Sequence, residues 1–369
     1  MVATLVALSL VIAALAGAAL VPKWSLAHIA RQPIAAHTIV VPVSRAPRGT
    51  LSLAAHDLYM RARDDQFSRS DSGARVAIGY LRLAIDADTA FAAAYAALAH
   101  MQVVLGMGED YVNSPPRDLY PRALAAARRA VALDDASAEA HAELGFAELV
   151  AANDLRTAEA ELRYAIVLDP ADSRGHEYLS KLLSTADRGP EAVIEARRAL
   201  DADPMSVSAS AQFATALLAD ARYDEALGQL SALRRVVPPV RRVPSLAASV
   251  YVKRGMYREA ITQLRNVAGV SHGPARLRSL LAYALARAGE RDEAEAMLTD
   301  LIASWRHGTA GALDVAQAYL GLGERESAFR WLEWSVDDYS LREAITAPIF
   351  DDLRKDERFN ALRRRILPL

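Results

Sequence analysis

The chain has 369 residues, of which 52% are hydrophobic, 24% are charged and 7% are aromatic. Its 43 basic and 45 acidic side chains leave a net charge of -2, which excludes a general electrostatic attraction to nucleic acid or to an acidic membrane surface. The absence of cysteine excludes disulfides, thiol nucleophiles and thiolate zinc sites. The composition favours packed helices, arranged either as two or three domains or as one long array.

The first predicted element is an uncharged apolar helix over residues 2–21. At about 1.5 Å rise per residue, a helix of this length spans the roughly 30 Å hydrocarbon core of a bilayer. Pro22, Lys23 and Trp24 follow it and are typical of a membrane interface. A cleaved signal peptide is the alternative, because small residues alternate around Ala16. The length of the apolar run and the lack of a preceding Lys or Arg favour an uncleaved anchor.

Further along the chain an alanine recurs at an interval of 34 residues. Six such positions are in unbroken phase, namely Ala158, Ala192, Ala226, Ala260, Ala294 and Ala328. Apolar or small residues follow each alanine at offsets of 4 and 7, which lie on one face of a helix. A second helical pattern precedes each alanine. Every unit therefore predicts a pair of amphipathic helices that buries its apolar face only against the next pair.

Two earlier helix pairs, built around Ala77 and Ala123, fit the pattern less closely, and a loop rich in Gly and Pro lies at residues 106–120. With them, about eight pairs are expected. A helix pair of 34 residues with these small and large positions resembles the tetratricopeptide repeat (TPR). The resemblance implies an all-α fold, a right-handed superhelical solenoid of about eight TPR-like pairs whose inner groove is lined by the first helix of each pair.

The last part of the chain predicts a helix that caps the solenoid. It is charged on one face and apolar at Phe350, Leu353, Phe359, Leu362 and Ile366. The exposed end of a repeat array needs such a one-sided helix. The expected organisation is a transmembrane anchor or signal peptide at residues 1–21, an extended tether with four prolines at 22–50, a TPR solenoid at 51–340 and a C-terminal cap at 341–369.

The order of these parts resembles the repeat region that follows the membrane helix in bacterial winged-helix transcriptional regulators of the ToxR/CadC type. Three features carry the resemblance: residues 54–70, the long second pair with its proline-containing loop, and residues 350–368. The resemblance implies a single-pass protein of a bacterial inner membrane, attached through its N-terminal helix, with the repeats in the periplasm. No DNA-binding or catalytic module precedes the apolar helix in this sequence.

The sequence predicts no catalytic site, no metal site and no cofactor. The histidines are scattered, and the stretch HEYLS at His176 lacks the second histidine of a zinc-protease motif. Acidic pairs such as Asp134 and Asp135 fall at turns, where Asp caps backbone N–H groups. Trp331 and Trp334 lie one turn apart and could stack on a ligand, but covering the end of the solenoid is the favoured interpretation.

The predicted binding site is the groove of pairs six and seven. If the first helices line this groove, four cations, three serines and one tyrosine face inward together: Arg242, Ser245, Ser249, Lys253, Arg276, Ser279, Tyr283 and Arg287. Such a surface fits an acidic peptide or a peptide C-terminus. An ordinary solvated surface is the alternative interpretation.

We therefore expect a non-catalytic, membrane-tethered scaffold of a bacterial envelope that binds a protein or peptide, with acidic peptides as one candidate class, and that does not bind nucleic acid. The alternative function is the sensory or regulatory half of a transmembrane transcriptional regulator or signalling protein that lacks its output domain. The two hypotheses share one architecture, so the sequence alone does not choose between them.

Overall fold

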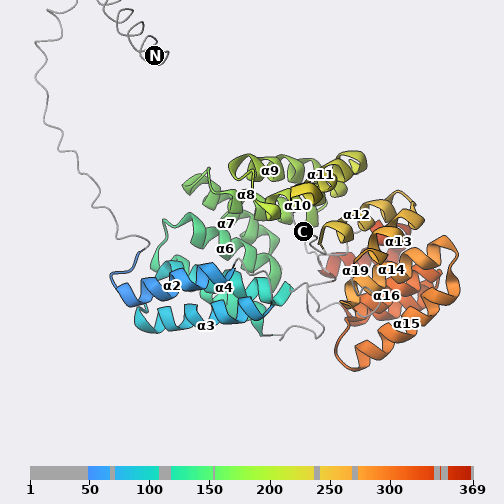
Figure 1. The fold of residues 1–369 in the computed structure, drawn as a ribbon, viewed down its shortest axis with the longest axis horizontal. Coiled ribbons are helices and arrows are strands. Elements are labelled where there is room, and N and C mark those ends of the chain that lie inside the picture. Colours follow the sequence, from blue (N-terminus) through green and yellow to red (C-terminus); the bar gives the residue numbers. More distant parts are fainter. Residues whose placement is uncertain are drawn as a thin grey trace, which may run out of the picture. The chain divides into compact units, whose positions relative to one another are not determined.

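The computed structural model describes residues 49–66, 71–107, 118–152, 154–236, 242–267, 273–335, 341 and 348–366. All of them belong to one compact unit, which runs from Ala46 to Leu369. The predicted anchor at residues 1–21 and nearly all of the predicted tether at 22–50 lie outside the described residues. Within the described ranges the regular structure is helical and contains no strand (Figure 1), so the predicted all-α fold is confirmed.

Helices α2 to α17 form eight consecutive antiparallel pairs. In chain order the pairs are α2 (Leu53–Gln66) with α3 (Asp71–Ala87), α4 (Ala92–Met107) with α5 (Leu119–Leu133), α6 (Ala138–Ala147) with α7 (Leu155–Leu168), α8 (Ser173–Thr185) with α9 (Gly189–Ala202), α10 (Val207–Ala219) with α11 (Tyr223–Val236), α12 (Arg242–Lys253) with α13 (Tyr257–Arg265), α14 (Ala275–Ala288) with α15 (Arg291–Arg306), and α16 (Ala312–Leu322) with α17 (Arg325–Trp334). A π-helical turn, η4 (Glu148–Ala152), extends α6. A 3-10 helix, η6 (Pro348–Leu353), and α19 (Glu357–Ile366) follow the last pair.

The recurring alanines lie where the two helices of a pair pack most closely. All six alanines of the 34-residue series, and also Ala77 and Ala123, are fully buried. In the third pair a Cβ added to Gly145 of α6 would lie only 2.9 Å from the carbonyl oxygen of Ala158 in α7. The interval in the sequence therefore reflects a steric requirement for small side chains at one contact in each pair.

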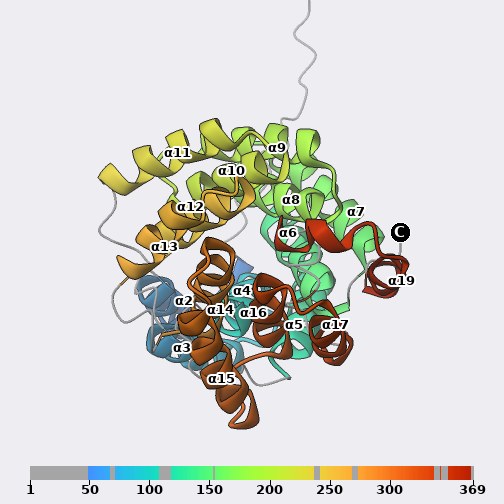
Figure 2. The same cartoon turned by 90° about the vertical axis from the view of Figure 1, so that its right-hand side faces the viewer.

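The hydrophobic core runs along the array and is not gathered at one centre. One cluster of buried side chains extends from Val103 in α4 to Ile366 in α19, and a second covers α2 to α6. Figure 2 shows the first helices of the pairs, α6 to α16, toward the inside of the curve and the second helices, α7 to α17, outside it. This is a TPR-like solenoid, in which each pair is stabilised by its neighbours. The right-handed sense of the superhelix stays a prediction.

The predicted location in a bacterial inner membrane is wrong. Among the helices of the described residues, none is both long and apolar enough to cross a membrane. The apolar helix α4, for example, has 16 residues, which cover about 24 Å at 1.5 Å per residue, short of the hydrocarbon core. The segment at residues 2–21, on which the prediction depended, lies outside the described residues.

The turn between the two helices of a pair has one conformation in five successive repeats. The turn residue has a positive φ of 64° at Asp187, 58° at Ala221, 71° at Gly255, 90° at Gly289 and 82° at Gly323, again at intervals of 34 residues. Glycine adopts this left-handed conformation without a steric penalty, asparagine and aspartate tolerate it, and alanine does not. Ala221 is therefore in a strained conformation.

We expect Ala221→Gly to stabilise the protein by about 0.5–1 kcal/mol. Removal of Cβ relieves the strain of the left-handed conformation, and this gain exceeds the cost of the greater conformational entropy that glycine gives the unfolded chain. The measurement is thermal unfolding followed by circular dichroism. Ala219→Gly is the matched control, since Ala219 is exposed at the end of α10 and is helical. This control should lower stability by up to about 1 kcal/mol. Equal destabilisation by both substitutions would contradict the assignment of strain to Ala221.

Candidate functional site

The predicted groove residues divide between α12 and α14, and two of them are enclosed by helix packing. Ser279 and Tyr283 are 0% and 6% exposed. The Ser279 hydroxyl donates a hydrogen bond to Oε1 of Gln317 in α16 at 2.5 Å. A Cβ on Gly321 of α16 would lie 2.6 Å from Cα of Tyr283, so the backbones of α14 and α16 are in direct contact. The Ser279 side chain therefore joins α14 to α16, and Tyr283 is buried where the two backbones meet.

The other predicted residues have local partners or exposed positions. The Ser249 hydroxyl donates to the backbone oxygen of Ser245 at 3.1 Å within α12. Arg287 is exposed, donates to the Tyr257 hydroxyl at 3.2 Å and lies over the Tyr257 ring. Arg276 is exposed, Lys253 is half-buried in the last turn of α12, and Arg242 is the first residue of that helix. The binding role predicted for this set stays a prediction, and two of its members, Ser279 and Tyr283, are buried.

A different set of polar side chains meets on the first helices of pairs two, three and four. It comprises His100 of α4, Glu143 of α6, and Arg174 and Tyr178 of α8, and we call it the inner polar cluster. Nδ1 of His100 lies 3.3 Å from Oε2 of Glu143 and 2.9 Å from the Tyr178 hydroxyl. The Tyr178 hydroxyl donates to Oε1 of Glu143 at 3.1 Å. Glu143 is 2% exposed, whereas the side chain of His100 is 30% exposed.

Aromatic and cationic groups border this cluster. The rings of Phe146 and Tyr178 stack with centroids 4.3 Å apart. Nζ of Lys181 lies 5.4 Å from the centroid of the Phe146 ring and 3.8 Å from the sulfur of Met107. Phe146 and Tyr178 are each 5% exposed, while Lys181 is only half-buried. A charged and aromatic patch thus spans three consecutive repeats.

The charge of Glu143 determines how the cluster ionises. Burial alone would lower the pKa of His100, but the negative charge of Glu143 and their hydrogen bond outweigh burial, so the pKa lies above the ordinary value of 6.5. Burial and the same carboxylate raise the pKa of Tyr178 well above its usual range, which keeps the phenol protonated. Burial would also lower the pKa of Arg174, but the carboxylates of Glu139, Asp172 and Glu143 raise it. Arg174 stays charged and is neutralised by three acids.

A second kind of polar pair joins the two helices within a repeat. Nδ1 of His141 lies 2.6 Å from Oε2 of Glu161, and Nδ1 of His176 lies 2.6 Å from Oε2 of Glu195. Burial would raise the pKa of Glu195, but the hydrogen bond from His176 and the charge of Arg198 outweigh it and lower the pKa. His176 therefore joins the two helices of its repeat. Since these pairs recur at about one repeat length, they belong to the architecture of the repeat.

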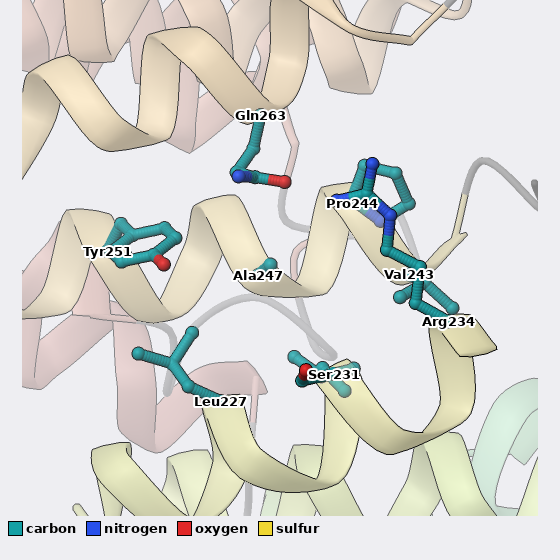
Figure 3. Close-up of a pocket in the computed structure, with 9 residues that line it drawn as sticks. Leu227, Ser231, Arg234, Val243, Pro244, Ala247, Tyr251 and Gln263 are labelled. Carbon is teal, nitrogen blue, oxygen red and sulfur yellow. The ribbon is translucent and has the colours of Figure 1, made fainter.

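A small pocket lies between the fifth and sixth pairs (Figure 3). Its volume is about 170 Å³, and its lining residues come from α11, α12 and α13: Leu227, Leu230, Ser231, Arg234, Val243, Pro244, Ala247, Tyr251 and Gln263. The lining is mixed: Leu227, Leu230, Val243, Pro244 and Ala247 are apolar, and Ser231, Arg234, Tyr251 and Gln263 carry polar groups. A cavity of about 150 Å³ holds a benzene-sized group, so this pocket can accept one apolar side chain.

The tryptophans of the last two pairs pack on one another. Trp305 stacks on Trp334 with centroids 5.4 Å apart and an interplanar angle of 9°, and Trp331 contacts both rings edge-on. Because the two stacked rings contact each other directly, no ligand fits between them. Trp334 is 65% exposed, so one ring of the cluster faces solvent.

No known protein family matches this chain, and no curated protein matches it. Several solved structures are similar. A tetratricopeptide repeat protein from Parabacteroides merdae ATCC 43184 is 13% identical over 86% of this chain and 100% of its own, with a TM-score of 0.44. Yeast Tom70 is 16% identical over 85% of this chain and 68% of its own, with a TM-score of 0.48.

A third similar structure is YrrB, a TPR protein with an unusual peptide-binding site, which is 20% identical over 50% of this chain and 89% of its own, with a TM-score of 0.34. At these identities and TM-scores the likenesses concern the fold and do not transfer a function to this chain. The resemblance to ToxR/CadC-type regulators stays a prediction.

We expect the inner polar cluster to make stability depend on pH. The pKa of His100 is higher in the folded state than in the unfolded state. Protonated His100 therefore contributes fully to stability at a pH below its unfolded-state pKa, and this contribution is lost as the pH rises through its folded-state pKa. His100→Gln should therefore cost about 1.5–3 kcal/mol near pH 5.5, the range for a hydrogen bond to a charged group, and less near pH 8.5. Urea unfolding at both pH values measures the difference.

The control for this experiment is His307→Gln, since His307 is exposed at the end of α15. A cost of His100→Gln that is the same at both pH values, or larger at the alkaline one, would contradict the role given to the pair of His100 and Glu143.

Proposed function

We propose that the protein is a non-catalytic scaffold that binds a peptide segment of another protein on the inner surface of α4, α6 and α8. One observation carries this proposal: the inner polar cluster and the adjoining Phe146 and Lys181 come from three consecutive repeats and form one patch. A segment that crosses this patch would contact several repeats at once. Recognition would then depend on the spacing that the solenoid imposes.

The patch offers a peptide two kinds of contact. Lys181 and the partly exposed His100 can donate to carboxylates or backbone carbonyl groups of the ligand. The half-buried stem of Lys181, which lies beside Phe146, can supply apolar contact next to these donors. Arg174 is already paired with Glu139 and Asp172, so it adds little attraction for an acidic segment.

The arrangement also explains how the site keeps its shape. Glu143 accepts from Tyr178 of the next repeat and lies beside His100 of the preceding repeat. These contacts hold three first helices at a fixed separation before any ligand arrives. Preorganised groups lose little conformational entropy when a ligand binds, which favours affinity.

The test is a selection of displayed random peptides on the immobilised full-length chain, followed by affinity measurements with labelled peptides. We expect Lys181→Glu to weaken the selected peptides at least about tenfold, equivalent to about 1.4 kcal/mol. Arg330→Glu makes the same charge change at an exposed position on α17 and should leave affinity within about twofold. Peptides that bind both variants equally, or that protect the outer helices from hydrogen exchange, would contradict the proposed site.

A further inference from the structure

The C-terminal segment, residues 348–366, contacts repeats that are far from it in the sequence. Its first part, η6, packs against α12, the first helix of the sixth pair. Arg363 donates to Oδ2 of Asp187 at 2.8 Å, and Arg354 lies 3.4 Å from the same oxygen. Asp187 belongs to the turn between α8 and α9, 176 residues before Arg363. The segment therefore reaches back from the eighth pair to the fourth.

At its other contact the segment is fixed to the eighth pair. The guanidinium of Arg358 donates to both carboxylate oxygens of Glu326 at 2.9 and 3.0 Å and lies over the ring of Phe329, 4.2 Å from its centroid. Asp356 lies 3.7 Å from Arg325. Figure 2 shows α19 next to α17. The fourth to eighth pairs and the C-terminal segment thus form a closed series of contacts.

Apolar burial supplies most of the attachment energy. Phe350, Leu353 and Phe359 are 0% exposed, and the rings of Phe350 and Phe359 stack with centroids 5.7 Å apart. Burial of one such side chain contributes about 1.5–3 kcal/mol, whereas a partly exposed ion pair contributes about 0–1 kcal/mol. The aromatic residues therefore hold the segment, and the two arginines fix where it lies along the array.

Asp187 stands at the turn position that glycine occupies in three of the later repeats. It has the left-handed backbone conformation of that position, and its carboxylate is the group to which both arginines bind. Glycine would suit the backbone better but would offer no carboxylate. In this repeat the turn residue is therefore less well suited to the left-handed conformation than glycine, but its carboxylate binds the two arginines.

We propose that the C-terminal segment is an intramolecular ligand of the surface formed by α12 and the turn at Asp187. The partner that binds this surface in its place is an amphipathic helix with the same chemistry. Such a helix carries aromatic residues on one face and two arginines that reach Asp187. The proposal rests on the proposed peptide-binding function and concerns α12 and the turn after α8, in which Asp187 follows Lys181 by six residues. Binding of the partner and release of the segment are then coupled.

The test uses the full chain with Phe350→Ala and Phe359→Ala, which removes the apolar anchors of the segment. A fluorescent peptide with the natural sequence of residues 348–366 is then titrated onto this variant and onto the unaltered chain. A tethered segment competes at an effective concentration on the order of millimolar. We therefore expect the peptide to bind the variant at least about tenfold more tightly than it binds the unaltered chain, while hydrogen exchange in residues 348–366 of the variant rises.

Two controls make the result specific. A peptide in which Phe350 and Phe359 are replaced by Ala should bind the variant at least about tenfold more weakly. Adding Asp187→Asn to the variant should weaken the natural peptide about two- to fivefold, since Asn tolerates the left-handed turn but lacks the charge. A peptide with Arg363→Gln should then show no further loss in the Asp187→Asn background.

If exchange shows that the segment has left and the peptide still binds the variant no better than it binds the unaltered chain, the proposal is overturned. If the variant loses helicity, the single substitution Phe359→Ala replaces it, since this change still removes one of the apolar anchors. Unchanged exchange of residues 348–366 in that second variant would also overturn the proposal. The proposed function is tested by the effect of Lys181→Glu on selected peptides and this proposal by the titration of residues 348–366, so the two fail by different results.

Discussion

Every part of this structure depends on close approach between helices at positions that admit only small side chains. The buried alanines at 34-residue intervals, together with Gly145 and Gly321, set the distances within and between pairs. An amphipathic pair in isolation would expose its apolar face, so each pair is stable only in the array. The inner and outer surfaces follow from this packing, because the same helix of every pair faces the inside of the curve.

Polar groups are placed along the contacts between successive first helices, where the apolar core ends. Glu143 with Tyr178, Ser180 with Gln212, and Ser279 with Gln317 each join one repeat to the next. These bonds lie at the edge of the core, and a buried polar group that is paired costs little. The same packing determines which side chains are exposed on the inner surface. Ser279 and Tyr283 are buried between helices, whereas His100 and Lys181 are partly exposed.

The sequence was sufficient for the fold and insufficient for the candidate site. The periodic alanines predicted the helix pairs because packing against a neighbour constrains residue size at a fixed interval. His100, Glu143 and Tyr178 are separated by 43 and 35 residues, and the first of these spacings reflects the irregular second repeat, so no constant register brings them together. The contact of Arg363 with Asp187 spans 176 residues and leaves no periodic signal at all. Its only trace in the sequence is an aspartate at a turn position where three later repeats have glycine.

That long-range contact changes how the array is expected to lose its structure. In an open solenoid the terminal repeats can fray one after another, because each touches only its neighbours. Here the chain beyond the eighth pair is held by the turn of the fourth, so the intervening repeats form a loop closed by noncovalent contacts. Fraying from the C-terminal end would first have to break this closure, and the fourth to eighth pairs would then melt as one cooperative block.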